Sequence, residues 1–195
     1  TRAAFVDWPD SPTFTEALAD VPALEAYEPE WQRRYLGAEA SPAASLRAKY
    51  APVMLDVAWG LFEMRMAREP EADPNAVWTD ITSGYLGIRP HPEWSWWAIR
   101  GQLVDSPGYM LHYAIGAVVA ADVRARCREL RGPLSRSDPG YYEWLSARVF
   151  RFGLERPTRQ VLTEFLGRPL SPDAVLSDLA RLPRPRSGQR RAGRA

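Results

Sequence analysis

The sequence is poor in several residue types whose scarcity limits what the protein can be. Among its 195 residues are one cysteine, Cys127, and two histidines, and the formal net charge is +1. A single cysteine excludes a disulfide within the chain; we expect Cys127 to be a small packing residue, which is compatible with the cytoplasm. The balanced charge predicts neither nucleic acid nor a membrane surface as partner. No apolar run is long enough to span a bilayer, and no signal-peptide pattern is visible.

The alternating apolar pattern of half-buried β-strands is also absent, which predicts an all-α, multi-helix fold. Ser-Pro and Asp-Pro pairs, together with glycines, mark the expected helix starts and ends. The expected helices cover about 14–21, 26–36, 41–68, 74–86, 94–103, 107–131, 139–152, 157–166 and 172–179. Pro52 should kink or divide the third of them. We assign residues 1–182 to one helical domain and 183–195, rich in Pro, Gly and Arg, to a disordered tail.

The segment 107–131 is expected to be the most buried helix. Ser106 is a favourable N-cap, and Pro107 suits the first helical position. From Tyr109 to Val123 nearly every side of the helix is apolar, as in a helix at the centre of a core. The arginines near its end suit the negative pole of the helix and should reach solvent: Arg124, Arg126, Arg128 and Arg131. The near-regular spacing of the Ser-Pro and Asp-Pro starts would suit a helical solenoid. The segments between these starts do not repeat, so the solenoid is a minor alternative.

One stripe of this helix carries polar groups. Tyr109, His112, Tyr113 and Gly116 are spaced i, i+3, i+4 and i+7, so they share a face. Two phenols and an imidazole beside a glycine could form the wall of a binding or catalytic site. The commoner role of buried tyrosines is to pack their rings and bond their hydroxyls locally, so the stripe alone favours core packing.

A second polar feature lies near the start, in FTEALADVPALEAYEPEW, residues 14–31. Glu16 and Asp20 are four residues apart on an expected helix, so their carboxylates face one way. The segment resembles the helix that follows HExxH in the gluzincin zinc peptidases, especially the peptidyl-dipeptidase A (angiotensin-converting enzyme) family. The resemblance implies that Glu16 is a zinc ligand and that Asp20 supports a zinc-bound histidine from the second shell.

Later segments resemble the carboxypeptidase Taq family in the same order. They are VWTDITSGYLGI at 77–88 and GYMLHYAIGAVVAAD at 108–122, while residues 143–179 are similar to the closing helices of both families. In such peptidases zinc activates a water, and a tyrosine stabilises the oxyanion. The resemblance implies Tyr113 as that donor and Tyr109 as a substrate contact. His112 has no clear counterpart in the family segment; we keep it as a candidate substrate contact, with a packing or surface role equally open.

Two departures from the family pattern shape the prediction. HExxH is absent, because neither His91 nor His112 has a glutamate at the required spacing. We therefore expect the chain to be the C-terminal part of a longer enzyme whose N-terminal part is missing, with an incomplete Zn²⁺ site. The substrate-binding histidine expected before the tyrosines is absent as well, so Arg100 or Gln102 would bind a peptide carboxylate or carbonyl.

The leading interpretation is the C-terminal portion of a zinc-dependent metallopeptidase of carboxypeptidase or peptidyl-dipeptidase type, a hydrolase inactive as a fragment. The alternative is a non-catalytic helical domain that binds a peptide or a protein and has lost the metal site. A regulator that uses the Arg-rich tail on nucleic acid is disfavoured, because no structured basic surface is predicted beside the tail.

Overall fold

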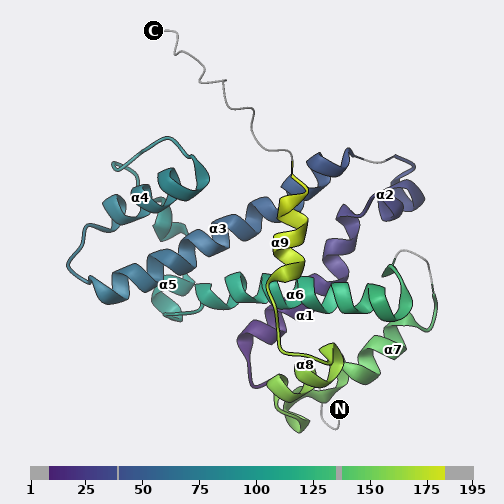
Figure 1. The fold of residues 1–195 in the computed structure, drawn as a ribbon. Helices are drawn as coiled ribbons and strands as arrows, with labels where there is room; N and C mark the ends of the chain where they lie inside the picture. Colours follow the sequence, from purple (N-terminus) through teal and green to yellow (C-terminus); the bar gives the residue numbers. More distant parts are fainter. Residues whose placement is uncertain (1–8, 39, 135–137, 183–195) are drawn as a thin grey trace.

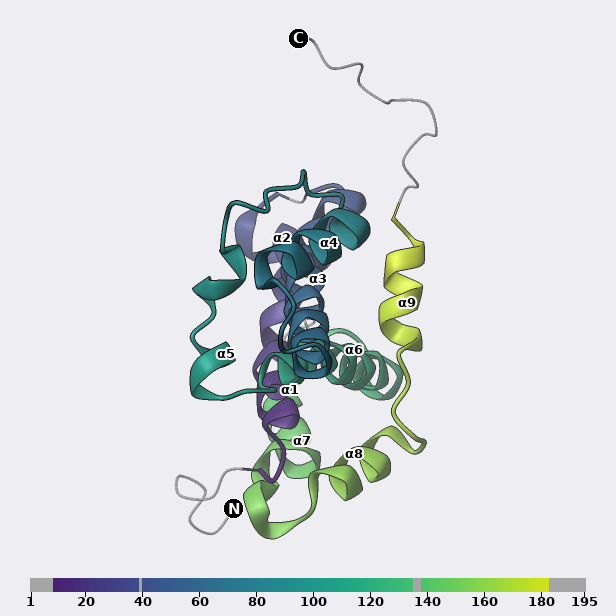
Figure 2. The ribbon, with the colours of Figure 1, turned by 90° about the vertical axis from the view of Figure 1, so that its left-hand side faces the viewer.

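The computed structural model describes residues 9–38, 40–134 and 138–182, and within them every regular element is a helix (Figures 1 and 2). The all-α prediction is thus confirmed. The α-helices are α1 (Pro12–Ala23), α2 (Pro29–Leu36), α3 (Pro42–Arg68), α4 (Pro74–Leu86), α5 (Gln102–Asp105), α6 (Met110–Arg131), α7 (Tyr141–Arg148), α8 (Thr158–Leu166) and α9 (Asp173–Ala180). Short 3₁₀-helices are η1 (Leu24–Tyr27), η2 (Trp96–Ile99) and η4 (Phe150–Glu155). None of the helices described is both long and apolar enough to cross a membrane.

Helix α6 is the centre of the molecule. Ten of its residues are buried, more than in any other described helix, as the sequence predicted. It packs against α1, α3, α8 and α9. In Figure 2, α1 and α9 lie on opposite sides of α6, so the helix is covered from both directions. An apolar surface all round a helix is stable only in such a position.

Two hydrophobic cores meet along α6. The first joins α1, α7 and α8 to the later part of α6, through residues such as Phe14, Val123 and Phe165. The second joins α3 and α4 to the first residue of α6, with Trp59 and Met110 among its buried members. Because α6 belongs to both cores, the residues near its start lie at the seam between them.

Helices α1 and α6 approach each other closely at Gly116. A Cβ added to Gly116 would lie 3.3 Å from the carbonyl oxygen of Thr13 and 3.5 Å from both the backbone nitrogen of Ala17 and Cβ of Glu16. Glycine therefore fits this position because the backbone of α1 occupies the space that a side chain would need. The contact holds the polar face of α1 directly against the tyrosine stripe of α6.

The start of α6 differs from the prediction. The helix begins at Met110 and not at Pro107, and Ser106 is not its N-cap; the carbonyl of Ser106 accepts a hydrogen bond from Tyr109 in a preceding turn. The cap comes from α3, where the carboxylate of Glu63 accepts hydrogen bonds from the backbone of Gly108 at 2.8 Å and of Met110 at 3.0 Å. A carboxylate at a helix N-terminus satisfies free N–H groups and the positive pole together.

The expectation that Arg124 reaches solvent is wrong. Its side chain is 3% exposed, and it donates to Glu25 at 2.8 Å and to Glu28 at 3.1 Å. Arg128 pairs with Glu28 as well. The segment that follows α1 folds back under α6 and supplies these carboxylates, so burying the arginine does not leave its charge unpaired.

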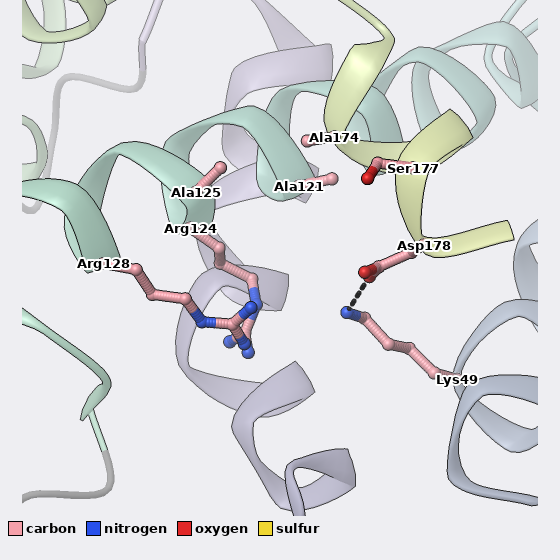
Figure 3. A pocket seen from close by; sticks show the side chains of 8 residues that line it. All are labelled: Lys49, Ala121, Arg124, Ala125, Arg128, Ala174, Ser177 and Asp178. Atoms are coloured by element: carbon pink, nitrogen blue, oxygen red, sulfur yellow. Dashed lines mark hydrogen bonds and ion pairs between the residues drawn. The ribbon is translucent and has the colours of Figure 1, made fainter. Parts of the chain in front are cut away.

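Helix α9 is held by hydrogen bonds and an ion pair close to those of Arg124 and Arg128. Lys49 of α3 donates to Asp178 at 2.9 Å, and the hydroxyl of Tyr50 donates to it at 2.6 Å. Figure 3 shows Lys49 and Asp178 on one side of a small cavity and the guanidinium groups of Arg124 and Arg128 on the other. Burial opposes ionisation of Asp178, but the hydrogen bonds from Tyr50 and Lys49 outweigh it and hold the pKa of this carboxyl below its ordinary value.

Pro52 does not divide α3; Pro52 and Ala48, whose carbonyl cannot accept from a proline nitrogen, are both exposed. Two expected helices changed. Residues 94–103 do not form one helix, because Arg100 is extended between η2 and α5 and pairs with Asp56 of α3. The helix expected over 139–152 ends at Arg148 and is followed by η4. The predicted tail, 183–195, lies outside the described residues.

We expect Gly116→Val to lower the free energy of unfolding by about 1–3 kcal/mol, because the branched side chain must push α1 away from α6. Gly84→Ala is the matched control: Gly84 lies in α4, an added Cβ would meet nothing within 4 Å, and alanine should raise stability by about 0.5–1 kcal/mol. Urea unfolding measures both. Equal stability of Gly116→Val and the parent chain would show that the approach of the two helices is not tight.

Asp178→Asn should lower the free energy of unfolding at pH 6 by about 2 kcal/mol, because it removes the charge that Lys49 and Tyr50 bind. The folded pKa of Asp178 is depressed, so this stability is present above its ordinary value of 3.8 and is lost as the pH falls through the folded value. The difference between variant and parent should therefore shrink in urea titrations toward pH 2.5. Asp80→Asn, which removes an exposed pair with Arg65, should have a much smaller effect.

Candidate functional site

The polar residues singled out in the sequence meet at the seam between the two cores. The hydroxyl of Tyr109 donates to Oε1 of Glu16 at 2.7 Å, joining the start of α6 to α1. Gln102 of α5 lies beside Tyr113, and Arg100 lies over the ring of Tyr113. Segments that are distant in the sequence thus place two carboxylates, two phenols, an amide and a guanidinium around one region, which we call the polar cluster: Glu16, Asp56, Arg100, Gln102, Tyr109 and Tyr113.

The hydroxyl proton of Tyr109 is used in the hydrogen bond to Glu16. This hydrogen bond to a carboxylate, with desolvation and the negative charge of Glu16, raises the pKa of the Tyr109 phenol to about 12. The rings of Tyr109 and Tyr113 pack edge to face, with centroids 5.4 Å apart. The pair is therefore both packed and polar: the rings fill space along the seam and the hydroxyls serve the cluster.

Tyr113 is arranged differently from Tyr109. Its oxygen accepts a long hydrogen bond of 3.5 Å from Nε2 of Gln102, so its own proton is not used by that contact. The guanidinium of Arg100 lies 5.9 Å from the centre of its ring and pairs with Asp56 at 3.0 Å. Of the two phenols, Tyr113 is the one with a proton available to an incoming carbonyl or oxyanion.

Two carboxylates of this region are held in unfavourable surroundings. Burial, followed by repulsion from Glu16, raises the pKa of Asp20 above its ordinary value, although Arg124 lowers it in part. Burial also raises the pKa of Asp56 against the effect of Arg100, and both Asp20 and Glu16 add to the rise. The carboxylate of Asp20 makes no hydrogen bond to the described residues. Clustered carboxylates with raised pKa values are typical of functional sites.

His112 is hydrogen-bonded to α1 and not to the polar cluster. Its Nδ1 lies 2.7 Å from the hydroxyl of Thr13, and its ring packs edge-on against Tyr109. The histidine thus joins α6 to α1 beside the close approach at Gly116. This arrangement gives His112 a packing role, and the prediction that it contacts substrate stays untested.

Asp56 was not among the residues expected from the sequence, although it is the partner of Arg100. A signal was present, because Asp56 is a lone carboxylate in the apolar run from Val53 to Trp59. A single acid among apolar residues of a long helix often marks a buried ion pair or a site. Whether Asp56 forms an ion pair or belongs to a site depends on the position of Arg100, and the tertiary structure sets this position.

A zinc site cannot be assembled from these residues alone. Within 9–38, 40–134 and 138–182 no three His, Cys, Asp or Glu side chains are grouped so that they could hold a metal ion. Glu16 offers one oxygen ligand, His112 is bonded to Thr13, and His91 stacks on Trp94. Protein zinc sites need three or four such ligands.

The cavity in Figure 3 is a separate feature with a volume of about 250 Å³. Its cations are Lys49, Arg124 and Arg128, and the acidic groups paired with them are Glu25, Glu28 and Asp178. Each of these cations is paired with a carboxylate, which leaves little net attraction for a charged ligand. We therefore assign this network to stability.

Replacing Glu16 by glutamine should lower the pKa of Tyr109 from about 12 toward its ordinary value of 10, because the amide carries no negative charge. The ¹³Cζ resonance of Tyr109, assigned with Tyr109→Phe, follows this titration. The raised folded pKa also means that the parent chain gains stability from this group below pH 10 and loses it between pH 10 and 12. Asp80→Asn is the control that should leave Tyr109 unchanged, and an unshifted titration in Glu16→Gln would contradict the hydrogen bond.

Comparisons with known proteins gave no relative: no protein-family model matches the chain, and neither a curated protein nor a solved structure does. The case for a function therefore rests on the motifs in the sequence and on the geometry of the polar cluster.

Proposed function

We propose that the polar cluster binds the backbone of a peptide and that the chain is the C-terminal portion of a zinc-dependent peptidase. The observation that carries this proposal is the 2.7 Å hydrogen bond between Tyr109 and Glu16. The family resemblance implies a carboxylate and a tyrosine in one site, and these two residues, 93 positions apart, are in contact.

In this proposal the residues of the chain have distinct tasks. The hydroxyl of Tyr113 donates a hydrogen bond to the carbonyl oxygen of the bond to be cleaved. This hydrogen bond strengthens as negative charge develops on that oxygen. Gln102 orients Tyr113 through its oxygen. Arg100, fixed by Asp56, is the cation that attracts a peptide carboxylate or carbonyl.

The metal requires ligands from outside the described residues, because no three possible ligands are grouped among them. Glu16 would be one of the residues that hold the metal, and Tyr109 beside it would contact the substrate. Zinc would supply Lewis-acid activation of water. The isolated chain is expected to bind zinc no tighter than micromolar.

A second candidate function is a non-catalytic peptide-binding domain. The observation that favours it is the same lack of a complete ligand group among the described residues. Both functions use the polar cluster for a peptide, and they differ in whether a metal is bound.

The test compares variants of the protein expressed from its whole reading frame. Tyr113→Phe keeps the ring and removes the donor, so kcat for peptide hydrolysis should fall on the order of a hundredfold with KM little changed. Glu16→Gln should instead lower zinc content, measured by elemental analysis after dialysis, and excess zinc should restore part of the activity. Tyr142→Phe, at an exposed position of α7, is the control for the loss of a phenol.

Other outcomes would change the role of a residue or the function of the chain. If Tyr109→Phe loses kcat while Tyr113→Phe keeps it, the donor is Tyr109. If both keep it, the stripe serves packing alone. If the protein neither retains zinc nor cleaves peptides, but calorimetry shows peptide binding that Arg100→Gln weakens, the second candidate is correct and the peptidase proposal is wrong.

A further inference from the structure

A second cavity, mostly apolar, lies next to the polar cluster. It has a volume of about 410 Å³ and is formed by α3, α4 and the segment 88–99 that leads to α5. Volumes of roughly 300–1,000 Å³ are usual for sites that take a small molecule or a side chain. Four tryptophans line it: Trp59, Trp78, Trp94 and Trp96. We call it the tryptophan cavity.

Part of its wall is a stack of parallel rings. His91 and Trp94 lie with centroids 4.4 Å apart and planes 9° from parallel, and Trp94 and Trp96 follow at 5.9 Å and 12°. Trp94 is 47% exposed and Trp96 is 56% exposed. Large aromatic rings left open to water beside a cavity are costly for a folded chain, and they mark a surface that a ligand covers.

The charges on the cavity walls disfavour one class of ligand. No carboxylate of the described residues lines it, whereas Arg89 and His91 do, and the nearby Glu93 is paired with His91 at 2.9 Å. An aromatic cage for an ammonium group gains from negative charge nearby and loses from positive charge, so these walls disfavour a cationic ligand. A neutral or anionic flat group is the chemistry that fits.

Arg100 connects the tryptophan cavity to the polar cluster. Its guanidinium lies 4.4 Å from the ring centre of Trp59, which lines the cavity, and 5.9 Å from that of Tyr113, which belongs to the cluster. Arg100 thus lies near a ring of each site, which places the tryptophan cavity beside the polar cluster.

We propose that the tryptophan cavity is a specificity site for an aromatic side chain of the peptide bound at the polar cluster. The proposal rests on the function proposed above only for the origin of the ligand. Trp94 is stacked between His91 and Trp96, so a flat ring would stack on Trp96, at the end of the stack. The flat ring gains from this stacking in addition to the apolar area it buries, whereas a saturated side chain of the same size gains the area alone.

The test uses two capped amino acids that differ only in the ring, N-acetyl-phenylalanine amide and N-acetyl-cyclohexylalanine amide. Titration into the ¹⁵N-labelled full chain, followed at the indole N–H resonances of Trp94 and Trp96, gives both affinities. Assignment uses Trp94→Phe and Trp96→Phe. Binding of the phenyl compound should be roughly threefold to tenfold tighter, the size of an aromatic pair contribution.

Variants locate the site. Trp96→Leu keeps an apolar side chain and removes the flat ring, so it should abolish most of the preference for phenyl over cyclohexyl. Because Trp96 is highly exposed, Trp96→Leu should not unfold the protein. The dispersion of the remaining indole signals checks that the variant is folded. Tyr142→Ala, an exposed aromatic residue of α7, should leave both affinities unchanged.

The proposal is overturned if the cyclohexyl compound binds as tightly as the phenyl compound, if Trp96→Leu leaves the preference intact, or if tetramethylammonium binds more tightly than either. No indole shift at millimolar concentration also overturns it. The two proposals fail separately: if the phenyl compound binds as expected but zinc and hydrolysis are absent, the specificity site remains and the peptidase function does not.

Discussion

The close approach of α1 to α6 at Gly116 is the constraint on which the rest of the structure depends. Without a Cβ at Gly116, the backbone of α1 lies directly against α6. This places Glu16 within reach of Tyr109 and Thr13 within reach of His112. Both core packing and the polar cluster follow from it, because the apolar face of α1 enters the first core while its polar face meets the tyrosines. A larger residue at position 116 would separate both at once.

The central position of α6 brings electrostatic costs that other helices offset. Burying Arg124 is tolerated because Glu25 and Glu28 meet its guanidinium, and the free N–H groups at the start of α6 are met by Glu63. Around the polar cluster the compensation is incomplete. Asp56 in the cluster and Asp20 near Glu16 have raised pKa values, chiefly through burial, so they reduce stability at neutral pH. A chain selected for stability alone would not keep half-buried carboxylates there, which supports a functional role for the cluster.

Arg100 is the structural link between the two sites that we propose. It is extended between η2 and α5, pairs with Asp56, and touches both Trp59 and Tyr113 through its guanidinium. A charge held between a phenol and an indole can bind the polar backbone of a ligand on one side and leave an apolar wall on the other. The peptide recognition that we propose would use that arrangement.

The sequence by itself determined the helical class, most helix positions and the burial of α6, because these depend on local periodicity and on proline and glycine. It also picked out Glu16, Tyr109, Tyr113, Arg100 and Gln102, through spacing and family resemblance. Only the tertiary structure decided what these residues touch. The carboxylates that bury Arg124, the cap that Glu63 provides and the pairing of Asp56 with Arg100 all join residues far apart in the chain. Such contacts depend on how helices pack in three dimensions, and no local pattern in the sequence encodes that.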